Sequence, residues 1–177
     1  MARVLFVIAK NGFQDVEYFI PREILGKAGH IITVASNGKT GEIAIGADNG
    51  EVKIDLNLVE VKVDDFDMIV FIGGSGALKN LDNNESYRLA QEAVGRNKFL
   101  AAICIAPAIL AKAGVLKNKK AAVWSSPFDK SGIEMLKNNG VDYQNENVVQ
   151  DGKIITANGP QAAKEFGEKL LLSLHKL

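Results

Sequence analysis

The sequence predicts an α/β protein with one doubly wound, mostly parallel sheet sandwiched by helices, in a single domain covering residues 1–177. Apolar runs of strand length alternate with segments of helical period, which is typical of parallel strands joined by crossover helices. The chain is also long enough to bury a full core without disulfides. Its composition of 47% hydrophobic and 24% charged residues is ordinary for a globular domain.

The first half of the chain is expected to contain three strands, one helix and one excursion. Residues 3–9 predict a buried strand, residues 13–28 a helix that ends at Gly29, and residues 31–35 a second strand. In residues 42–54, Asn49-Gly50 separates two β-prone runs, which predicts a hairpin or an irregular excursion. Residues 67–72 predict a central strand that leads directly into Gly73-Gly74-Ser75-Gly76.

The second half continues the alternation. The predicted elements are a helix over 84–97, a strand over 99–104, a helix over 106–113, a strand over 120–125 and a helix over 129–138. A hairpin is expected around Asp151-Gly152, between 148–149 and 154–156, and residues 160–175 predict the last helix. Ligands of doubly wound sheets bind at the carboxyl ends of the strands, so a site is expected at that edge.

Charge and cysteine content narrow the function classes. Lys plus Arg and Asp plus Glu both number 21, so no field of one sign is available to attract a phosphate backbone, and no nucleic-acid partner is expected. The one cysteine cannot form an internal disulfide. The apolar run at the start of the sequence is far too short to cross a bilayer and lacks the layout of a signal peptide. We therefore expect no membrane association and a cytoplasmic protein.

Cys104 is the first candidate functional residue. It lies where the strand over 99–104 ends and the next helix begins, with Ala102 and Ala106 two positions away on either side. A nucleophile elbow requires small residues at those two positions, and Pro107 suits a first helical turn. The positive end of that helix is expected to lower the pKa of the thiol. The alternative is that Cys104 is a small buried core residue, as free cysteines often are.

Glu17 is the second candidate, because it interrupts an apolar helix face. Phe13, Val16, Ile20, Ile24 and Ala28 are predicted to form the face that packs on the sheet, and Glu17 falls in the middle of it. A carboxylate there is costly to bury unless it is paired or protonated. Beside the thiol, its pKa would rise and it could share a proton with the sulfur. The alternative is a solvated carboxylate that complements the helix dipole.

The run Gly73-Gly74-Ser75-Gly76 is the third candidate, since it follows a central strand into the same edge. Glycines there allow backbone amides to point at a ligand and to form an oxyanion-binding pocket. No Gly-Lys-Ser/Thr follows the run, so it does not predict a nucleotide-binding loop. Trp124, Ser125 and Ser126 lie at the carboxyl end of the strand over 120–125 and are further candidates for the pocket wall.

Together these residues resemble the DJ-1/PfpI superfamily over nearly the whole chain. The stretches that carry the resemblance are 4–10, 13–17 with Pro21, 72–77, 102–107 and 148–160. The resemblance implies a flavodoxin-like sandwich, usually an obligate homodimer, with Cys104 as nucleophile and a protonated Glu17 against it. It further implies that the amides of Gly74 and Ile105, with Gly73 in the same loop, bind an oxyanion. No metal and no cofactor are expected.

The sequence departs from the superfamily in its histidines. Ile105 stands where the peptidase-like branch has a His after the cysteine, and Ser126 stands where the DJ-1-like branch has a His before a Pro. The chain has only His30 and His175, which are expected to be structural. A Cys-His dyad is therefore not expected, which makes a peptidase the least favoured reading. The His-x-Glu of a glutamine amidotransferase is also missing, because the sequence reads His175-Lys-Leu177 there.

Three functions remain open. The resemblance favours an enzyme of the glyoxalase or deglycase type, which acts on small reactive aldehydes such as methylglyoxal or on glycated proteins. The alternative is a non-enzymatic protein in which Cys104 senses peroxide by stepwise oxidation. The third reading is a relative that kept the fold and lost the chemistry.

Overall fold

A seven-stranded sheet forms the centre of the computed structural model, which describes residues 1–175. The strand order is β11-β12-β8-β7-β1-β3-β6, and all neighbouring pairs are parallel except β11 with β12. The strands are β1 (Arg3–Ile8), β3 (Ile31–Ser36), β6 (Leu56–Asn57), β7 (Met68–Phe71), β8 (Phe99–Ile103), β11 (Val148–Asp151) and β12 (Ile154–Ala157). The predicted mostly parallel, doubly wound sheet is therefore confirmed.

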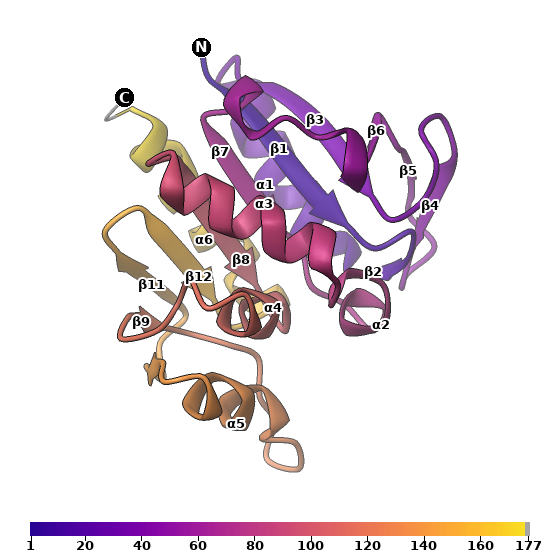
Figure 1. The fold of residues 1–177 in the computed structure, drawn as a ribbon. Coiled ribbons are helices and arrows are strands. Elements are labelled where there is room, and N and C mark those ends of the chain that lie inside the picture. Colours follow the sequence, from indigo (N-terminus) through magenta and orange to yellow (C-terminus); the bar gives the residue numbers. More distant parts are fainter. Residues whose placement is uncertain (176–177) are drawn as a thin grey trace.

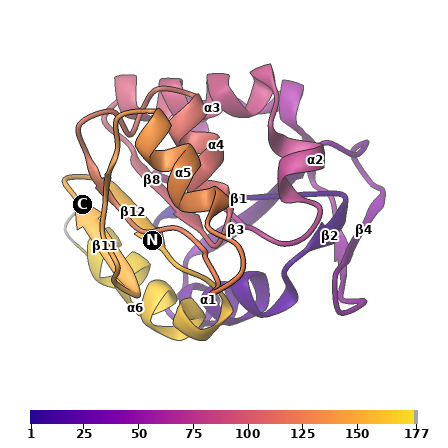
Figure 2. The ribbon, with the colours of Figure 1, turned by 90° about the horizontal axis from the view of Figure 1, so that it is seen from below.

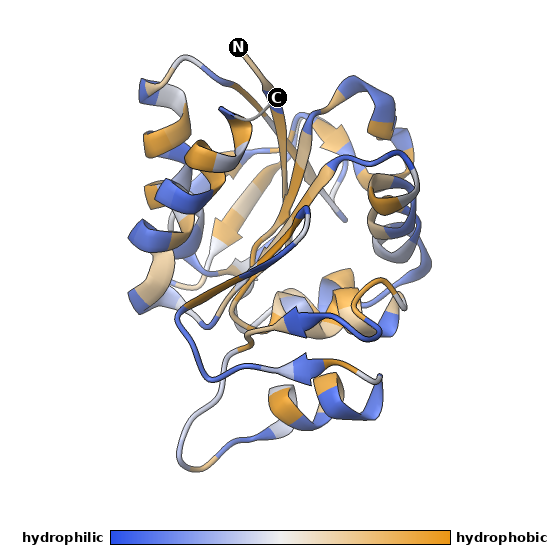
Figure 3. Cartoon of the chain, turned by 90° about the vertical axis from the view of Figure 1, so that its left-hand side faces the viewer, coloured by the Kyte–Doolittle hydropathy of each residue, from blue (hydrophilic) through white to orange (hydrophobic). Residues whose placement is uncertain are grey.

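Helices cover both faces of this sheet (Figures 1 and 2). One face carries α1 (Asp15–Lys27) and α6 (Ala163–Leu174), and the other carries α3 (Asn84–Gly95) and α4 (Ala106–Lys112). The remaining helices are α2 (Ala77–Leu81), α5 (Ser131–Asn138) and three 3-10 turns at Leu58–Glu60, Val63–Asp65 and Pro160–Ala162. Figure 3 shows apolar strands between helices whose outer surfaces are mostly hydrophilic.

Side chains of β1 divide the core between the two faces of the sheet. Val4, Phe6 and Ile8 belong to the cluster under α1 and α6, whereas Leu5 and Val7 belong to the cluster under α3 and α4. Successive residues of a strand point to opposite faces, and all five are fully buried. A strand buried on both faces reads as a continuous apolar run, which is why the sequence predicted it well.

Two small sheets flank the large one. Strand β4 (Ile43–Gly46) pairs antiparallel with β5 (Glu51–Lys53), which confirms the hairpin predicted within 42–54, and β2 (Asn11–Phe13) pairs with β4. The hairpin predicted around Asp151-Gly152 is also confirmed. The strand predicted over 120–125 is wrong in extent: only Lys120–Ala121 forms a strand, β9, and it pairs with β10 (Asp142–Tyr143) outside the large sheet. Strand β12 already pairs with β11 on one side and with β8 on the other, so residues 120–125 cannot pair with it.

The predicted packing face of the first helix is only partly correct. Val16 is 39% exposed and Ala28 is also exposed, whereas Tyr18, Pro21 and Leu25 are buried. The helix starts at Asp15, and Phe13 belongs to β2, so the buried face is rotated from the expected one. Glu17 is buried all the same, because it precedes Pro21 by one turn on the face that does pack inward.

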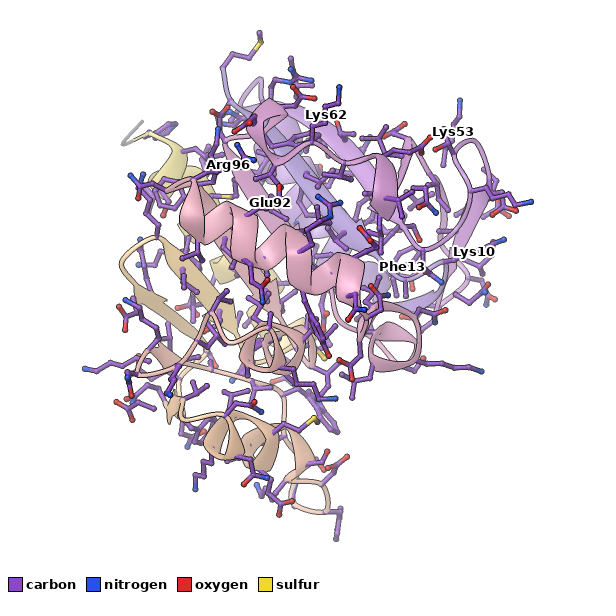
Figure 4. All side chains as sticks on the ribbon, in the orientation of Figure 1. Lys10, Phe13, Lys53, Lys62, Glu92 and Arg96 are labelled. Atoms are coloured by element: carbon purple, nitrogen blue, oxygen red, sulfur yellow. The ribbon has the colours of Figure 1, made fainter. Side chains whose placement is uncertain are left out.

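The solvent-facing side of α3 carries ion pairs. Figure 4 labels Glu92, on this helix, and Arg96, the residue directly after its end, with 3.9 Å between Arg96 Nε and Glu92 Oε2. Arg96 also lies 2.5 Å from Asp64. No helix within residues 1–175 has the length and apolar character needed to cross a membrane.

Candidate functional site: a cysteine elbow against a buried glutamate

The backbone at Cys104 is strained. Its φ is +65°, in the left-handed region, and the other non-glycine residues with positive φ in the described chain are all asparagine. Asparagine tolerates this region, whereas for cysteine it costs about 1–3 kcal/mol and persists only where the surroundings enforce it. Two neighbouring segments do so here. The Cys104 amide donates to the carbonyl of Ala157 at 2.9 Å, and its carbonyl accepts from Trp124 N at 2.8 Å.

This geometry is the sharp strand-to-helix turn expected of a nucleophile elbow. Cys104 comes directly after β8, and α4 begins at Ala106 with Pro107 in its first turn. Ala102 and Ala106 are completely buried, so a larger side chain at either position would overpack the core. The thiol-bearing residue itself is 8% exposed, enough for one side to reach a cleft.

Glu17 lies against this thiol from the first turn of α1. It is completely buried, which rules out the solvated carboxylate considered above. Its Oε2 accepts a hydrogen bond from Gly73 N at 3.2 Å, and the carboxyl group is hydrogen-bonded to Cys104. Its other oxygen, Oε1, is buried without a hydrogen-bond partner among residues 1–175. An unpartnered buried carboxylate oxygen is expensive, which favours the protonated form.

Burial raises the pKa of Glu17 from 4.5 to about 7, against the lowering effect of the hydrogen bonds from Cys104 and Gly73. The pKa of the Cys104 thiol is raised too, first by burial and then by the charge of Glu17. The expected lowering of this pKa by the helix end is therefore wrong. Amide hydrogen bonds from Gly74 and Ile105 do favour the thiolate, but burial and the neighbouring carboxylate outweigh them.

The glycine run lets three segments meet at this point. A Cβ on Gly73 would lie 2.6 Å from Cys104 Cβ and 3.0 Å from Glu17 Oε2, so only glycine fits between the two. Gly74 has a φ of +115°, and its amide and that of Ile105 both point at the thiol. The loops after β1 and β7 are joined by a hydrogen bond from Gln14 N to Gly73 O at 3.0 Å. They meet where the strand order reverses, which is where doubly wound sheets bind ligands.

The elbow opens into a cleft of about 390 Å³. Its wall combines apolar side chains with a smaller number of polar groups. The apolar part is formed by Leu78, Ile105, Trp124 and Pro160. The polar part is formed by Gln14, Ser75, Asp129 and Ser131, with Gly74 and Cys104 between the two.

The structure places Cys104, Glu17, Gly73, Gly74 and Ile105 next to one another at the carboxyl edge of the sheet, and their catalytic and oxyanion-binding roles stay predictions. Of the candidates for the pocket wall, Trp124 lines the cleft, whereas Ser125 and Ser126 do not. Sequence reasoning missed five polar and apolar wall residues, Gln14, Leu78, Asp129, Ser131 and Pro160. Their position after strands or at helix starts on the carboxyl edge was the signal that could have found them.

The two histidines lie at the opposite edge of the sheet. His30 precedes β3 and accepts a hydrogen bond from Ala2 N at 3.0 Å, and His175 ends α6. Both line a separate pocket with Met1, Ala2, Asp67 and Leu174. Neither is near Cys104, so the described chain forms no Cys-His dyad. Within the same residues, no group of three or more His, Cys, Asp or Glu side chains is arranged to hold a metal ion.

These features define a flavodoxin-like α/β protein with a cysteine on a nucleophile elbow. The chain belongs to the DJ-1/PfpI family, whose model matches residues 2–173.

Relatives of known name or structure agree with this assignment. The chain is 38% identical to the uncharacterized protein MJ0967 of Methanocaldococcus jannaschii, over 99% of this chain and 83% of that protein. It is 34% identical to the deglycase PfpI of Pyrococcus furiosus, over 89% of this chain and 90% of the relative. The crystal structure of a ThiJ/PfpI domain protein from Brachyspira murdochii superposes with a TM-score of 0.92 at 30% identity, covering 99% of this chain and 97% of the other.

Proposed function

We propose that this protein is a cysteine-dependent enzyme that acts on small reactive aldehydes such as methylglyoxal, and on the adducts they form with protein side chains. One observation carries the proposal. A completely buried glutamate with a pKa near 7 is hydrogen-bonded to a thiol on a strained elbow, and that elbow opens into a cleft. Perturbed titratable groups of this kind concentrate at functional sites.

In the first step, Glu17 serves as general base in place of the missing histidine. The carboxylate takes the thiol proton as Cys104 Sγ bonds to the aldehyde carbon. The aldehyde oxygen becomes an alkoxide, which the amides of Gly74 and Ile105 are positioned to stabilise. Glu17 then returns the proton to that oxygen, which leaves a neutral hemithioacetal and an ionised Glu17. A base with a pKa near the working pH is the most effective for such transfers.

In the second step, Glu17 moves a proton from the carbon bonded to sulfur to the neighbouring ketone carbon. It removes the hydrogen from the carbon bonded to sulfur, which gives an enediolate, and delivers a proton to the neighbouring carbon. The hydroxyl proton of the first carbon passes to the oxygen of the second, and the hemithioacetal becomes a lactoyl thioester. Water then hydrolyses the thioester, releasing lactate and restoring the thiol. The balance is one methylglyoxal and one water consumed for each lactic acid formed, without an external reductant or oxidant.

Lactate formation from methylglyoxal, measured without glutathione, tests this proposal. Wild type should form lactate, and both Cys104→Ala and Glu17→Gln should reduce the rate to the level without protein. Glu146→Gln is the matched control, because Glu146 is an exposed carboxylate outside the cleft. A wild-type rate equal to that of Cys104→Ala would overturn the proposal.

A second function, peroxide sensing, is supported by the same thiol. Cys104 is slightly exposed, and the amides of Gly74 and Ile105 that point at its sulfur are also suited to bind sulfinate oxygens. Each hydrogen peroxide would add one oxygen to the sulfur and leave as water, first giving a sulfenate and then a sulfinate. Mass spectrometry after mild peroxide treatment tests this function, which an unmodified Cys104 would exclude.

Peptidase activity, the homodimer and the cytoplasmic location also stay proposals. A cysteine peptidase is the least supported reading, since no histidine lines the cleft to carry a proton to a leaving amine. The homodimer implied by the family resemblance and the cytoplasmic location are predictions. Size-exclusion chromatography with light scattering and fractionation of the source cells would test them.

A further inference from the structure

The rim of the cleft carries one formal charge. The ten residues that line the cleft include no lysine, arginine or histidine, and Asp129 is the only acidic residue among them. Glu17 is not part of this lining, because it lies behind the thiol. A substrate that carries a carboxylate or a phosphate would therefore find no cation to pair with in this wall. It would find a carboxylate instead.

Asp129 is held in place at that rim by its own loop. Its Oδ1 accepts a hydrogen bond from Ser131 N at 2.9 Å, at the start of α5. Its backbone amide donates to Ser126 Oγ at 3.0 Å, and its carbonyl accepts from Ser126 N at 2.9 Å. The hydrogen bonds from Ser131 lower the pKa of the Asp129 carboxyl group, so it is ionised at neutral pH.

The charge at the reacting centre has the same sign. The Glu17–Cys104 pair carries a negative charge once its first proton is lost, and the thiolate is the group that must meet the substrate. The apolar side chains of Ile105, Trp124 and Leu78 make up much of the wall between this centre and the rim. Asp129 is exposed, so water screens part of its field, but its charge and that of the pair have the same sign and no cation of the cleft lining offsets them.

We propose that Asp129 is a specificity-determining residue that makes the cleft select neutral and cationic carbonyl compounds over those that carry a carboxylate or phosphate. The substrate part of this inference rests on the proposed aldehyde chemistry. Neutral methylglyoxal is accepted, an aldehyde adduct on a lysine or arginine side chain is favoured, and a 2-oxoaldehyde that carries a carboxylate, such as 4,5-dioxopentanoate, is disfavoured. The electrostatic part applies to any small molecule that approaches Cys104.

Charged thiol reagents measure this selectivity without any need for catalysis. Methanethiosulfonates react when the thiolate attacks their sulfenyl sulfur and methanesulfinate leaves, and the only cysteine of the chain makes the signal unambiguous. We would compare a trimethylammonium-ethyl reagent with a sulfonato-ethyl reagent. Each rate is normalised to the rate with free mercaptoethanol. Wild type should favour the cationic reagent at low ionic strength, and 0.5 M salt should reduce the preference.

Asp129→Asn is the decisive variant, since asparagine keeps the oxygen that accepts from Ser131 N. A unit charge acting over roughly 7 Å in water changes an encounter rate by about threefold. Asp129→Asn should therefore slow the cationic reagent and speed the anionic one by about that factor each. Asp142→Asn is the matched control, because Asp142 is exposed and does not line the cleft. Unchanged rates in Asp129→Asn, or no salt dependence in wild type, would overturn the inference.

Aldehyde kinetics separate this inference from the proposed function. If the protein turns over methylglyoxal, Asp129→Asn should lower the ratio of kcat/KM for methylglyoxal to that for 4,5-dioxopentanoate, a 2-oxoaldehyde that carries a carboxylate, by about threefold, chiefly by improving the anionic substrate. A ratio that does not change contradicts the role of Asp129 and leaves the enzyme intact. If no aldehyde is consumed but the reagent rates shift as described, the selectivity of the cleft stands and the enzymatic proposal fails.

Discussion

The carboxyl group of Glu17 is hydrogen-bonded to the thiol of Cys104, although the two residues come from opposite sides of Gly73 and from segments far apart in the sequence. Neither group is solvated well enough to ionise at its ordinary pKa, and ionisation of one hinders ionisation of the other. Such a pair loses its protons in two coupled steps.

Glu17→Gln should lower the pKa of the Cys104 thiol. The variant removes the neighbouring negative charge that helps to raise that pKa, and the amide can donate to the thiolate. Iodoacetamide alkylation followed against pH should therefore show faster reaction of the variant at pH 8, while its lactate formation is lost. A pKa that rises in Glu17→Gln would instead mean that Glu17 donates a proton to a thiolate that is already formed.

Activity should depend on pH through the titration of Glu17. The general base must be ionised, and burial places its pKa at about 7. We expect kcat/KM for methylglyoxal to rise between pH 5.5 and 8.5 with a midpoint near 7, and to fall tenfold per unit of pH well below it. A profile that is flat across this range would exclude Glu17 as the base.

Glu17 should also make folding less favourable at alkaline pH. Its pKa is raised from 4.5 to about 7, so the folded protein binds this proton more tightly than the unfolded chain. The resulting stabilisation is present below pH 4.5 and is lost as the pH rises through 7. The difference between the two pKa values corresponds to about 3 kcal/mol of unfolding free energy. The stability of Glu17→Gln relative to wild type should therefore be greater at pH 8 than at pH 5, by thermal or urea unfolding.

The control for that comparison is Glu146→Gln, which removes an exposed carboxylate. Its stability relative to wild type should change little between the two pH values. If Glu17→Gln behaved in the same way as this control, the carboxyl group of Glu17 would not be buried in solution.

Gly73→Ala should damage both the fold and the thiol site. The added Cβ would lie 2.6 Å from Cys104 Cβ and 2.8 Å from Ile103 O, which requires the backbone to move. Overpacking of this kind costs about 1–3 kcal/mol, and here it displaces the elbow from Glu17. Gly26→Ala is the matched comparison, because nothing lies within 4 Å of its added Cβ. That variant should be as stable as wild type or more so, since alanine favours a helix.

His30 should make the protein sensitive to acid. Burial, then the N-terminal charge and His175, lower the pKa of His30, and its Nδ1 accepts from Ala2 N and so must stay unprotonated. The unfolded chain therefore binds a proton that the folded protein resists, and stability falls as the pH drops below about 6.5. His30→Asn keeps an acceptor without titrating, so wild type should lose more stability than this variant between pH 7 and pH 5. A parallel loss in the two proteins would contradict this role.

The sequence predicted the central strands and the two hairpins well, and it failed at the edge of the sheet. Residues 120–125 have the apolar pattern of a strand, but only Lys120–Ala121 forms one. An apolar sequence pattern indicates that a segment is buried, but it does not indicate which strand pairs with the edge of a sheet. The first helix shows the same limit. Its burial was predicted, but the burial of Glu17, Tyr18 and Leu25 in place of Val16 depends on how the helix rotates against α6.

By itself, the sequence determined that this is an α/β protein with Cys104 between a strand and a helix and Glu17 in the first turn of another helix. These are properties of local pattern and of chain order. Only the tertiary structure decided that Cys104 adopts a φ of +65°, that the pKa of its thiol is raised rather than lowered, and that Asp129 lies at the rim of the cleft. The physical reason is that the strained backbone and the shifted pKa values result from contacts with groups in segments far apart in the sequence. Glu17 meets Gly73 across 56 positions, and no local pattern encodes that contact.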